Sequence, residues 1–328
     1  MGGDNAPGEI VAGACAAAKA VSCRVLLVGD ASALKPLIER SGAPENVECI
    51  HADQRIAMDE APSAAVRRGP ATSMGKTIDL VREGSADAAF SAGNSGAFLA
   101  IATIRLRPLP GIARAAFATV WPAKRGPMLV LDAGANVDCK PEWIAQFAVM
   151  GSAYARAVFG IAEPRVGLLS IGEEEGKGNA MVDAATPLLR QAPIAFAGNV
   201  EGRDMLLGGV DVIVCDGFVG NVALKLAEGA GEYLFGALKE ASNSSLAARI
   251  GAALLRGKLR EIRKRMDYRE YGGAPLLGVR GICLIGHGRT DALAVESACR
   301  AAVRAVQQDL VAAIGSAFAP SGEGRTSA

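Results

Sequence analysis

Short apolar runs alternate with alanine-rich helical stretches along nearly all of this 328-residue chain, and this alternation limits the possible folds most strongly. The runs are rich in leucine and in β-branched residues, and almost every one ends in Gly, Asp or Asn. Such a succession is typical of βα units, in which helices cover both faces of a mostly parallel sheet. We therefore expect an α/β fold with strands in the runs 24–29, 47–52, 88–93, 128–134, 166–172, 194–200, 210–217 and 281–288.

Composition and length favour a single globular domain. Half of the residues are apolar and only 5% are aromatic, which suits close packing of helices on a sheet. A chain of this length buries a sufficient core without disulfides or a structural metal. We find no internal repeat and no Pro/Ser-rich linker, so we expect one domain over residues 1–318 and a small, polar, disordered tail over 319–328.

Several classes of protein and site have little support in the sequence. The two histidines, His51 and His287, lie far apart, and the cysteines form no C-x-x-C pair, so we expect no metal site and reduced cysteines in a cytoplasmic protein. No apolar stretch approaches the ~20 residues of a membrane span, and no signal peptide is visible. The formal net charge of +1 indicates no nucleic-acid partner. No glycine motif fits a P-loop or a dinucleotide fingerprint.

The loops that follow the apolar runs carry the candidate binding residues. Carboxyl ends of parallel strands meet at one edge of a sheet, so we expect these loops to converge on one ligand site. The loops 93–98 and 216–221 each precede a helical pattern, and amides at a helix start can hold an anion. Taken singly, each loop is better explained as an ordinary capped turn, but the loops 131–136 and 197–204 repeat the arrangement.

The segment 170–179, SIGEEEGKGN, follows a predicted strand and combines three glutamates, one lysine and three glycines. Lys177 between Gly176 and Gly178 can bring one ammonium group to a site walled by backbone amides, which suits phosphate or a developing oxyanion. A solvated lysine in a surface loop explains the same letters equally well. No Ser or Cys in these loops has a histidine in its sequence context, so an acyl-enzyme mechanism has little support.

Taken together, the motifs resemble those of one known family. In chain order they are MGGDNAP, SAGNSGA, LDAGAN, SIGEEEGKGN, GNVEGRD, DGFVGNVALK and YGGAPLLGV. From residue 1 to about residue 310, their order and spacing closely resemble the PlsX family of bacterial phosphate acyltransferases. The resemblance implies a homodimer with a phosphotransacetylase-like or isocitrate-dehydrogenase-like three-layer α/β/α sandwich, cytoplasmic and peripherally attached to the membrane. It also implies that inorganic phosphate attacks the thioester of an acyl-(acyl carrier protein), giving acyl phosphate and free carrier protein for phospholipid synthesis.

The resemblance implies roles for individual residues. Lys177 would neutralise the phosphate or the tetrahedral oxyanion, and Asn221 would donate a hydrogen bond to it. No metal, cofactor or covalent intermediate is required, because phosphate is already a nucleophile at neutral pH. The residues expected to line the site and to position phosphate and the pantetheine arm are Asp4, Asn5, Asn94, Ser95, Gly96, Asp132, Asn136, Gly178, Asn179 and Gly220.

The chain departs from the family pattern at its first residue. Family members usually begin with a short strand of the type IAVDA before MGGDNAP, whereas this sequence begins at the methionine of that motif. Without such a strand, ladder groups would be unpaired and core residues uncovered. We therefore predict that the true start lies upstream. In-frame upstream codons for a short β-branched run ending in Asp-Ala would support this prediction, and a stop codon directly before Met1 would refute it.

The segment 249–269 is strongly basic, with eight Lys or Arg residues against two acidic ones. Apolar residues recur at helical spacing, so we expect a protruding helical hairpin over about 237–269. A bend between Gly251 and Gly257 would leave two adjacent leucines at an exposed tip. A hairpin packed on its dimer mate, with a solvated basic face, explains the pattern too. With the family resemblance, the residues expected to contact an anionic membrane or the acidic carrier protein are Leu254, Leu255, Arg256, Lys258, Arg260, Arg263 and Lys264.

Three other functions stay open on the residues alone. A phosphotransacetylase-like enzyme that uses acyl-CoA needs the same site but no acidic protein partner. An NAD-linked dehydrogenase on a related fold needs a dinucleotide fingerprint and a metal-binding carboxylate cluster, which the sequence lacks. A non-catalytic scaffold or lipid-binding module at the membrane surface needs the loops only as structure.

Overall fold

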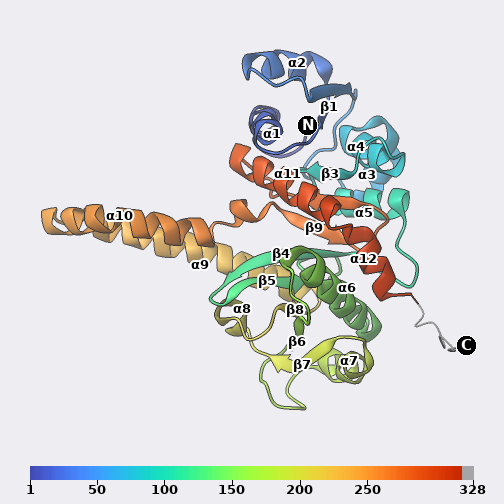
Figure 1. The fold of residues 1–328 in the computed structure, drawn as a ribbon, viewed down its shortest axis with the longest axis vertical. Helices are drawn as coiled ribbons and strands as arrows, with labels where there is room; N and C mark the ends of the chain where they lie inside the picture. Colours follow the sequence, from blue (N-terminus) through green and yellow to red (C-terminus); the bar gives the residue numbers. More distant parts are fainter. Residues whose placement is uncertain (320–328) are drawn as a thin grey trace, which may run out of the picture.

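A large mixed sheet with helices on both faces forms the centre of the protein (Figure 1). In the computed structural model, which describes residues 1–319 apart from the side chains at positions 263, 265, 266 and 268, this sheet has eight strands. In spatial order they are β3 (Ala88–Ser91), β10 (Ile282–Ile285), β9 (Ala274–Leu277), β4 (Ala116–Ala123), β5 (Gly126–Leu131), β8 (Val212–Val214), β6 (Arg165–Leu169) and β7 (Ala195–Val200). A separate parallel pair consists of β1 (Val25–Gly29) and β2 (Val47–His51). The α/β class is confirmed, and each of the eight expected runs overlaps a strand.

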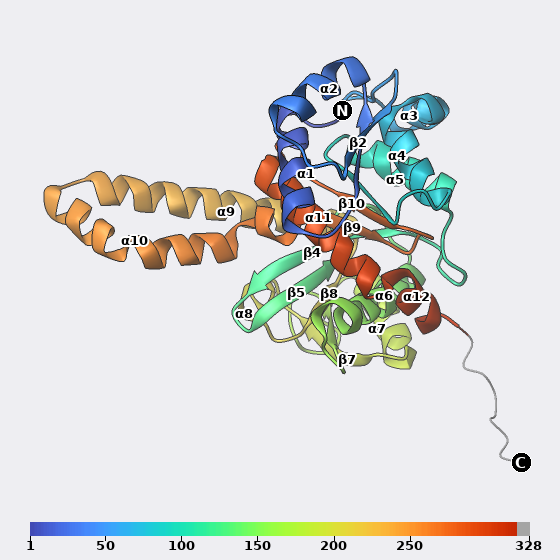
Figure 2. The same ribbon diagram turned by 45° about the horizontal axis from the view of Figure 1, so that its top comes forward.

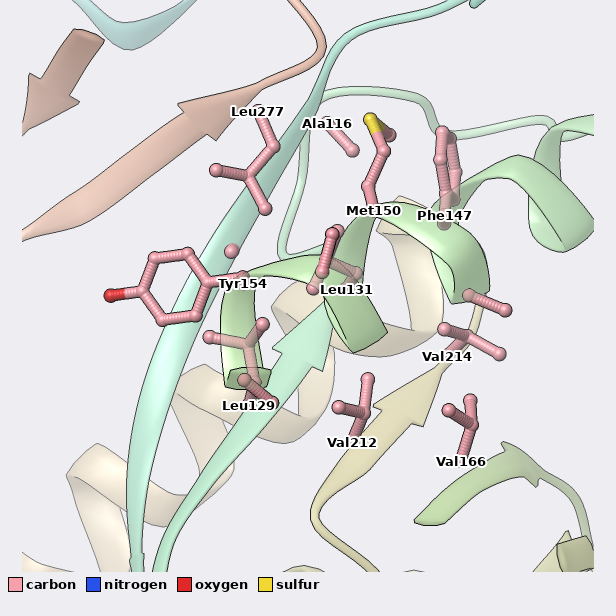
Figure 3. Packing of buried hydrophobic residues seen from close by; sticks show 14 of the residues in the cluster. Ala116, Leu129, Leu131, Phe147, Met150, Tyr154, Val166, Val212, Val214 and Leu277 are labelled. Carbon is pink, nitrogen blue, oxygen red and sulfur yellow. The ribbon is translucent and has the colours of Figure 1, made fainter. Parts of the chain in front are cut away.

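Helices cover the sheet because alternate strand residues face opposite layers. Leu129 and Leu131 of β5 pack in the core shown in Figure 3, whereas Met128 and Val130 pack on the other face. The layer on the side of Leu131 contains α6 (Pro141–Phe159), α7 (Ala180–Gln191), α11 (Ala292–Gln307) and α12 (Leu310–Ala317), with α1 (Gly8–Ala20) packed on α11. The opposite layer contains α3 (Pro62–Arg68), α4 (Ser73–Arg82), α5 (Ser95–Leu106), α8 (Asp204–Leu207) and the start of α9 (Gly217–Asn243).

The remaining elements are short or lie outside these two layers. They are α2 (Ala31–Arg40), which contacts α1 and β2, the 3₁₀ turns η1 (Gly69–Ala71) and η2 (Tyr268–Tyr271), and α10 (Leu246–Met266).

Two strands that were not among the predicted runs, β4 and β9, run antiparallel to their neighbours. Leu131, the last residue of β5, is opposite Ala118 of β4. Ile285, the last residue of β10, pairs with Ala274 of β9, and β9 pairs with the first two residues of β4. These registers bring the carboxyl ends of β5 and β10 to nearly the same level of β4 from opposite directions. The loops after the two sets of parallel strands therefore face each other across the middle of the sheet.

A cavity of about 560 Å³ lies beside Met1, between β1 and β3. It is lined by Arg24, by residues 25–28 of β1 and by residues 85–92 around β3, which is an edge strand of the large sheet. Met1 packs on Gly29, the last residue of β1, and Gly2 packs on the backbone of Gly93 after β3. The upstream start itself stays a prediction.

A helical hairpin protrudes from the sheet, as Figures 1 and 2 show, and its boundaries differ from the expected ones. It consists of α9, of 27 residues, and α10, of 21 residues, which are joined at Ser244 and Ser245. The predicted span of about 237–269 is wrong at its start because α9 begins at Gly217, directly after β8.

The predicted bend between Gly251 and Gly257 is also wrong. Both glycines lie inside α10, which is continuous from Leu246 to Met266. Each glycine costs a helix only about 1 kcal/mol, which the hydrogen bonds of a long helix outweigh. The turn instead occurs where Ser245 caps α10 by accepting a hydrogen bond from the Ala248 amide at 3.1 Å.

The two leucines expected at the tip lie within α10 instead. Leu254 and Leu255 are 83% and 56% exposed, so they are accessible along the helix although they do not form the tip. The side chain of Arg263, which was placed on the same surface, lies outside the described residues, as does the predicted tail beyond Ala319. The single domain over 1–318 stays a prediction.

Candidate active site

The loop after β5 is built around a buried carboxylate. Asp132 has no exposed surface, and its Oδ1 accepts hydrogen bonds from the amides of Phe117, Gly134 and Ala135 at 3.2, 3.0 and 2.9 Å. Its Oδ2 accepts from the main-chain and side-chain amides of Asn136 at 2.7 and 2.8 Å. Burial raises the pKa of the Asp132 carboxyl, and these hydrogen bonds act in the opposite direction. The structure therefore places Asp132 and Asn136, both predicted to line the site, as the groups that hold the loop 132–136 in shape.

The first turn of α9 packs directly on this loop through glycine. A Cβ on Gly220 would lie 1.9 Å from the carbonyl oxygen of Asp132, so no other residue fits there without moving the backbone. This close approach brings Asn221 over Gly134, whose own Cβ would lie 3.4 to 3.5 Å from side-chain atoms of Asn221. Gly134 has a φ of +129°, a region that favours glycine. Asn221 itself is exposed, so its amide group is accessible above the loop.

The N-terminal segment lies between the loops that follow β3 and β10. The Asp4 amide donates to the carbonyl oxygen of Gly288 at 2.7 Å. The Asn5 side chain donates to the carbonyl oxygens of Arg289 and Thr290, each at 3.2 Å. Asn5 therefore ties two chain segments together, while the Asp4 side chain is exposed at their junction.

The start of α5 is capped by Asn94, as expected if the loop 93–98 is an ordinary capped turn. Asn94 Oδ1 accepts from the Ala97 amide at 2.9 Å, and Asn94 Nδ2 donates to the carbonyl oxygens of Met58 and Glu60, both at 2.9 Å. Ser95 is exposed in the first turn, followed by the partly exposed Gly96. First-turn amides have no acceptor within their helix, so they remain suited to an anion.

The loop that contains Lys177 is ordered by its backbone. The carbonyl oxygen of Lys177 accepts hydrogen bonds from Ser170 Oγ at 2.6 Å and from Asn199 Nδ2 at 3.1 Å. Gly178 has a φ of +150°, and Asn179 caps α7. The loop follows β6, the neighbour of β8, and the Lys177 side chain is exposed. Within residues 1–319, no hydrogen bond or ion pair joins Lys177 to Asn221.

One face of α9 connects the two groups of loops. Asn221, Lys225, Glu228 and Glu232 follow each other at spacings of four, three and four residues, so they share this face. Lys225 Nζ lies 2.8 Å from Glu228 Oε2. The sequence interpretation missed Lys225, Glu228 and Glu232, although their helical spacing from Asn221 was the signal for them.

The far end of this face meets the loop after β10. Arg289 forms an ion pair with Glu232 of α9 at 3.4 Å. Burial lowers the pKa of His287, with further lowering by Lys225 and Arg289, whereas Glu228 and Asp4 act in the opposite direction. We call the set Asp4, Asn221, Lys225, Glu228, Glu232, His287 and Arg289 the α9 cluster.

Residues 1–319 contain no group of three or more His, Cys, Asp or Glu side chains arranged to hold a metal ion. Over the same range, no helix combines the length and the apolar character needed to cross a bilayer.

Solved structures with the same architecture include two phosphotransacetylases. The enzyme from Streptococcus pyogenes superposes with a TM-score of 0.62 over 92% of both chains at 17% sequence identity. The EutD phosphotransacetylase from Staphylococcus aureus gives a TM-score of 0.60 at 16% identity, covering 92% of this chain and 91% of its own. At identities this low, the comparison shows the fold alone. The two superpositions confirm the phosphotransacetylase-like sandwich.

Sequence comparison is far more specific. A phosphate acyltransferase from Nostoc punctiforme is 50% identical over 321 residues, which cover 97% of this chain and 94% of the relative. A phosphate acyltransferase from Moorella thermoacetica is 50% identical over 315 residues, covering 96% and 93%. The model of the family described as "Fatty acid synthesis protein" matches residues 1–313. The chain therefore belongs to this family of fatty acid synthesis proteins, the PlsX family.

Proposed function

We propose that this protein transfers the acyl group of an acyl-(acyl carrier protein) to inorganic phosphate, giving acyl phosphate and free carrier protein for phospholipid synthesis. The proposal rests on two relatives named phosphate acyltransferase, which are 50% identical to this chain over nearly its whole length. A phosphate oxygen attacks the thioester carbonyl carbon, negative charge develops on the carbonyl oxygen, and the C–S bond then breaks to release the thiolate of the carrier. The substrate already contains the nucleophile, so the protein has to align it and stabilise charge.

The residues suit this division of work. The exposed Asn221 amide, fixed by the packing of Gly220 on the loop 132–136, is a donor for the developing oxyanion. Lys177, in the loop after the neighbouring strand, supplies a cation on a backbone that Ser170 and Asn199 hold in place. The exposed start of α5 offers main-chain amides to an anion from the opposite side.

Thioester loss measured with and without phosphate tests the function. We expect phosphate-dependent release of free carrier protein from acyl-(acyl carrier protein), and slower turnover of acyl-CoA at equal concentration. Faster turnover of acyl-CoA would instead identify a phosphotransacylase that uses acyl-CoA. Loss of thioester that does not depend on phosphate would contradict the proposal and leave a non-catalytic scaffold as the better explanation.

We also propose that the hairpin attaches the protein to anionic membranes and receives the acidic carrier protein. Leu246, Ile250 and Leu254 recur every four residues on α10 and are 75%, 56% and 83% exposed. Exposed cations lie along the same helix: Arg249, Arg256, Lys258, Arg260 and Lys264. A helix of this kind binds in the plane of the membrane interface, so the whole length of α10 replaces the expected tip as the contact. Each surface cation contributes about 1 kcal/mol, which makes attachment reversible and sensitive to salt.

Flotation with anionic liposomes checks this attachment. Ile250→Glu together with Leu254→Glu should release the protein, because two exposed apolar groups on one stripe become charged, and high salt should weaken binding of the unchanged protein. Ile104→Glu is a matched control, since Ile104 is 58% exposed on α5. Unchanged flotation of the double variant would contradict the proposal. If Arg256→Glu with Arg260→Glu impairs turnover of soluble acyl-(acyl carrier protein), the basic face binds the carrier.

Finally, we propose that the protein is a cytoplasmic homodimer. Leu226 and Tyr233 of α9, seven residues apart on one face, are 72% and 79% exposed. Large apolar side chains repeated along an exposed helix are typical of surfaces that pair with another helix.

A further inference from the structure

The loop after β6 carries one charged group that has no partner, the Lys177 ammonium. Two of the three glutamates in the loop, Glu173 and Glu175, are paired with arginines outside it, at 3.2 and 3.0 Å. In the part of the chain that the structure describes, the Lys177 ammonium takes part in no hydrogen bond or ion pair. The cation is therefore available to an anion, but no contact of its own fixes its position.

Two side chains from the sheet hold the backbone at Lys177. Asn199 Nδ2 donates to the carbonyl oxygen of Lys177 at 3.1 Å and to that of Glu174 at 3.4 Å. Ser170 Oγ donates to the same Lys177 oxygen at 2.6 Å. Asn199 lies on β7, and Ser170 directly follows β6. The position of the Lys177 backbone is therefore set by donors on two neighbouring strands.

The side chain of Asn199 has no second polar contact that would explain its presence. Its oxygen, Oδ1, is buried and has no hydrogen-bond partner within residues 1–319. A reversed amide would turn this oxygen toward two carbonyl oxygens, which repel it, so the loop itself fixes the orientation of the amide. A buried acceptor without a partner is unfavourable. The favourable polar contribution of this side chain is therefore its two bonds to the loop.

The first carbons of the Lys177 side chain are confined as well. A Cβ on the buried Gly172 would lie 3.1 Å from Lys177 Cγ and 3.3 Å from Lys177 Cβ, so the stem of the lysine passes close to that glycine. The direction in which the lysine leaves the loop is thus set by the backbone and by this contact. Only the outer part of the side chain, which ends in the ammonium, is free to turn.

We propose that Asn199 is the positioning residue for Lys177, an assignment that rests on the phosphate acyltransferase function proposed above. Without its amide, Ser170 alone holds the Lys177 carbonyl group from the sheet, and a shift of the backbone carries the ammonium away from the phosphate or the oxyanion. A displacement of about 1 Å at a reacting group costs up to about 10²-fold in rate. Asn199 therefore acts on the reaction through Lys177.

Cleavage by a lysine-specific protease tests the holding of the loop without any turnover. Asn199→Ala should speed cleavage of the bond after Lys177 about tenfold, because loss of two neutral hydrogen bonds makes local opening more frequent. Mass spectrometry identifies each cleaved bond, and the rate of cleavage after Lys258 on α10 should not change. An unchanged rate after Lys177 would mean that Asn199 does not hold the loop, and the proposal would be wrong.

Asn46→Ala is the matched control for activity. Asn46 is also a part-buried asparagine whose Nδ2 donates to two carbonyl oxygens, at 3.1 and 2.7 Å, but it lies directly before β2 and away from the loop after β6. We expect Asn199→Ala to lower kcat/KM for phosphate about tenfold or more, and Asn46→Ala to stay within about twofold of the unchanged protein. Ser170→Ala, a second variant, removes the other donor and should act in the same direction as Asn199→Ala. Equal losses in Asn46→Ala and Asn199→Ala would contradict the assignment.

A double-mutant cycle shows whether Asn199 acts through Lys177. Adding Asn199→Ala to Lys177→Ala should change kcat/KM by no more than about twofold, because the group that Asn199 positions is already gone. Losses that multiply would overturn the proposal, and so would normal turnover of Lys177→Ala beside impaired turnover of Asn199→Ala. If the unchanged protein shows no phosphate-dependent turnover, the proposed function fails, and the cleavage rates still decide whether Asn199 holds Lys177.

Discussion

Asp132→Asn should lower the free energy of unfolding by about 3 kcal/mol and reduce turnover of the folded protein about 10²-fold. The substitution keeps the size of the side chain but turns one acceptor oxygen into an NH₂ group. In the structure both oxygens accept, Oδ1 from three main-chain amides and Oδ2 from Asn136 through its main-chain and side-chain amides. An amide side chain leaves at least two buried donors without an acceptor. The loop that supports Asn221 would then shift.

Chemical denaturation and steady-state turnover measure the two effects separately. Asp138→Asn is the matched control, because Asp138 is exposed farther along the same loop and its replacement should change stability by no more than about 0.5 kcal/mol. Equal stability of the two variants would show that the carboxylate does not hold the loop. Lower stability with normal turnover would show that the loop does not position the reacting groups.

Lys177→Ala should lower kcat/KM about 10²-fold without lowering the melting temperature. A cation placed in advance beside a phosphate or an oxyanion contributes about 3 kcal/mol to the transition state. The side chain is exposed, and the loop is held through the carbonyl oxygen of Lys177, which alanine retains. Asn221→Ala should have a similar but smaller effect on the rate.

Lys124→Ala provides the control for this loss of charge. Lys124 is an exposed lysine in the turn between β4 and β5, at the amino end of β5 and therefore away from the loops that carry the site. Its replacement should leave kcat/KM unchanged. Near-normal turnover of Lys177→Ala at saturating phosphate would instead mean that the loop is a solvated turn and that the cation of the site is another residue.

The sequence predicted the strands whose apolar runs end in a polar or glycine-rich loop. The strands β4 and β9 were missed for separate reasons: β4 passes through Pro122 into a tight turn, and β9 is short and contains Pro275. Proline cannot donate to a ladder, so such segments give a weak strand signal. Their antiparallel direction, which brings the two sets of loops face to face, follows from pairing between distant segments and has no local signature.

The candidate site was predicted by residue type better than by role. Asparagine and aspartate after a strand do mark the loops that meet, but Asn5, Asn94, Asp132 and Asn136 use their side chains to bind backbone. Capping and ligand binding require the same small polar residues, so sequence alone does not separate them. In the hairpin, helical periodicity was informative, whereas the turn depended on the capping serine and not on the glycines.

The length of α9 sets the distance between the groups around Asn221 and the turn of the hairpin. It runs without interruption from the loop beneath Asn221 to the turn beyond Asn243, and it contains no proline. At 1.5 Å per residue, the turn of the hairpin is about 27 Å from Lys225. Whatever binds at that turn is therefore held one helix length away from the groups that surround Asn221. An acyl group bound there would have to span this gap on a tether, or leave its binding place, before transfer beside Asn221 could occur.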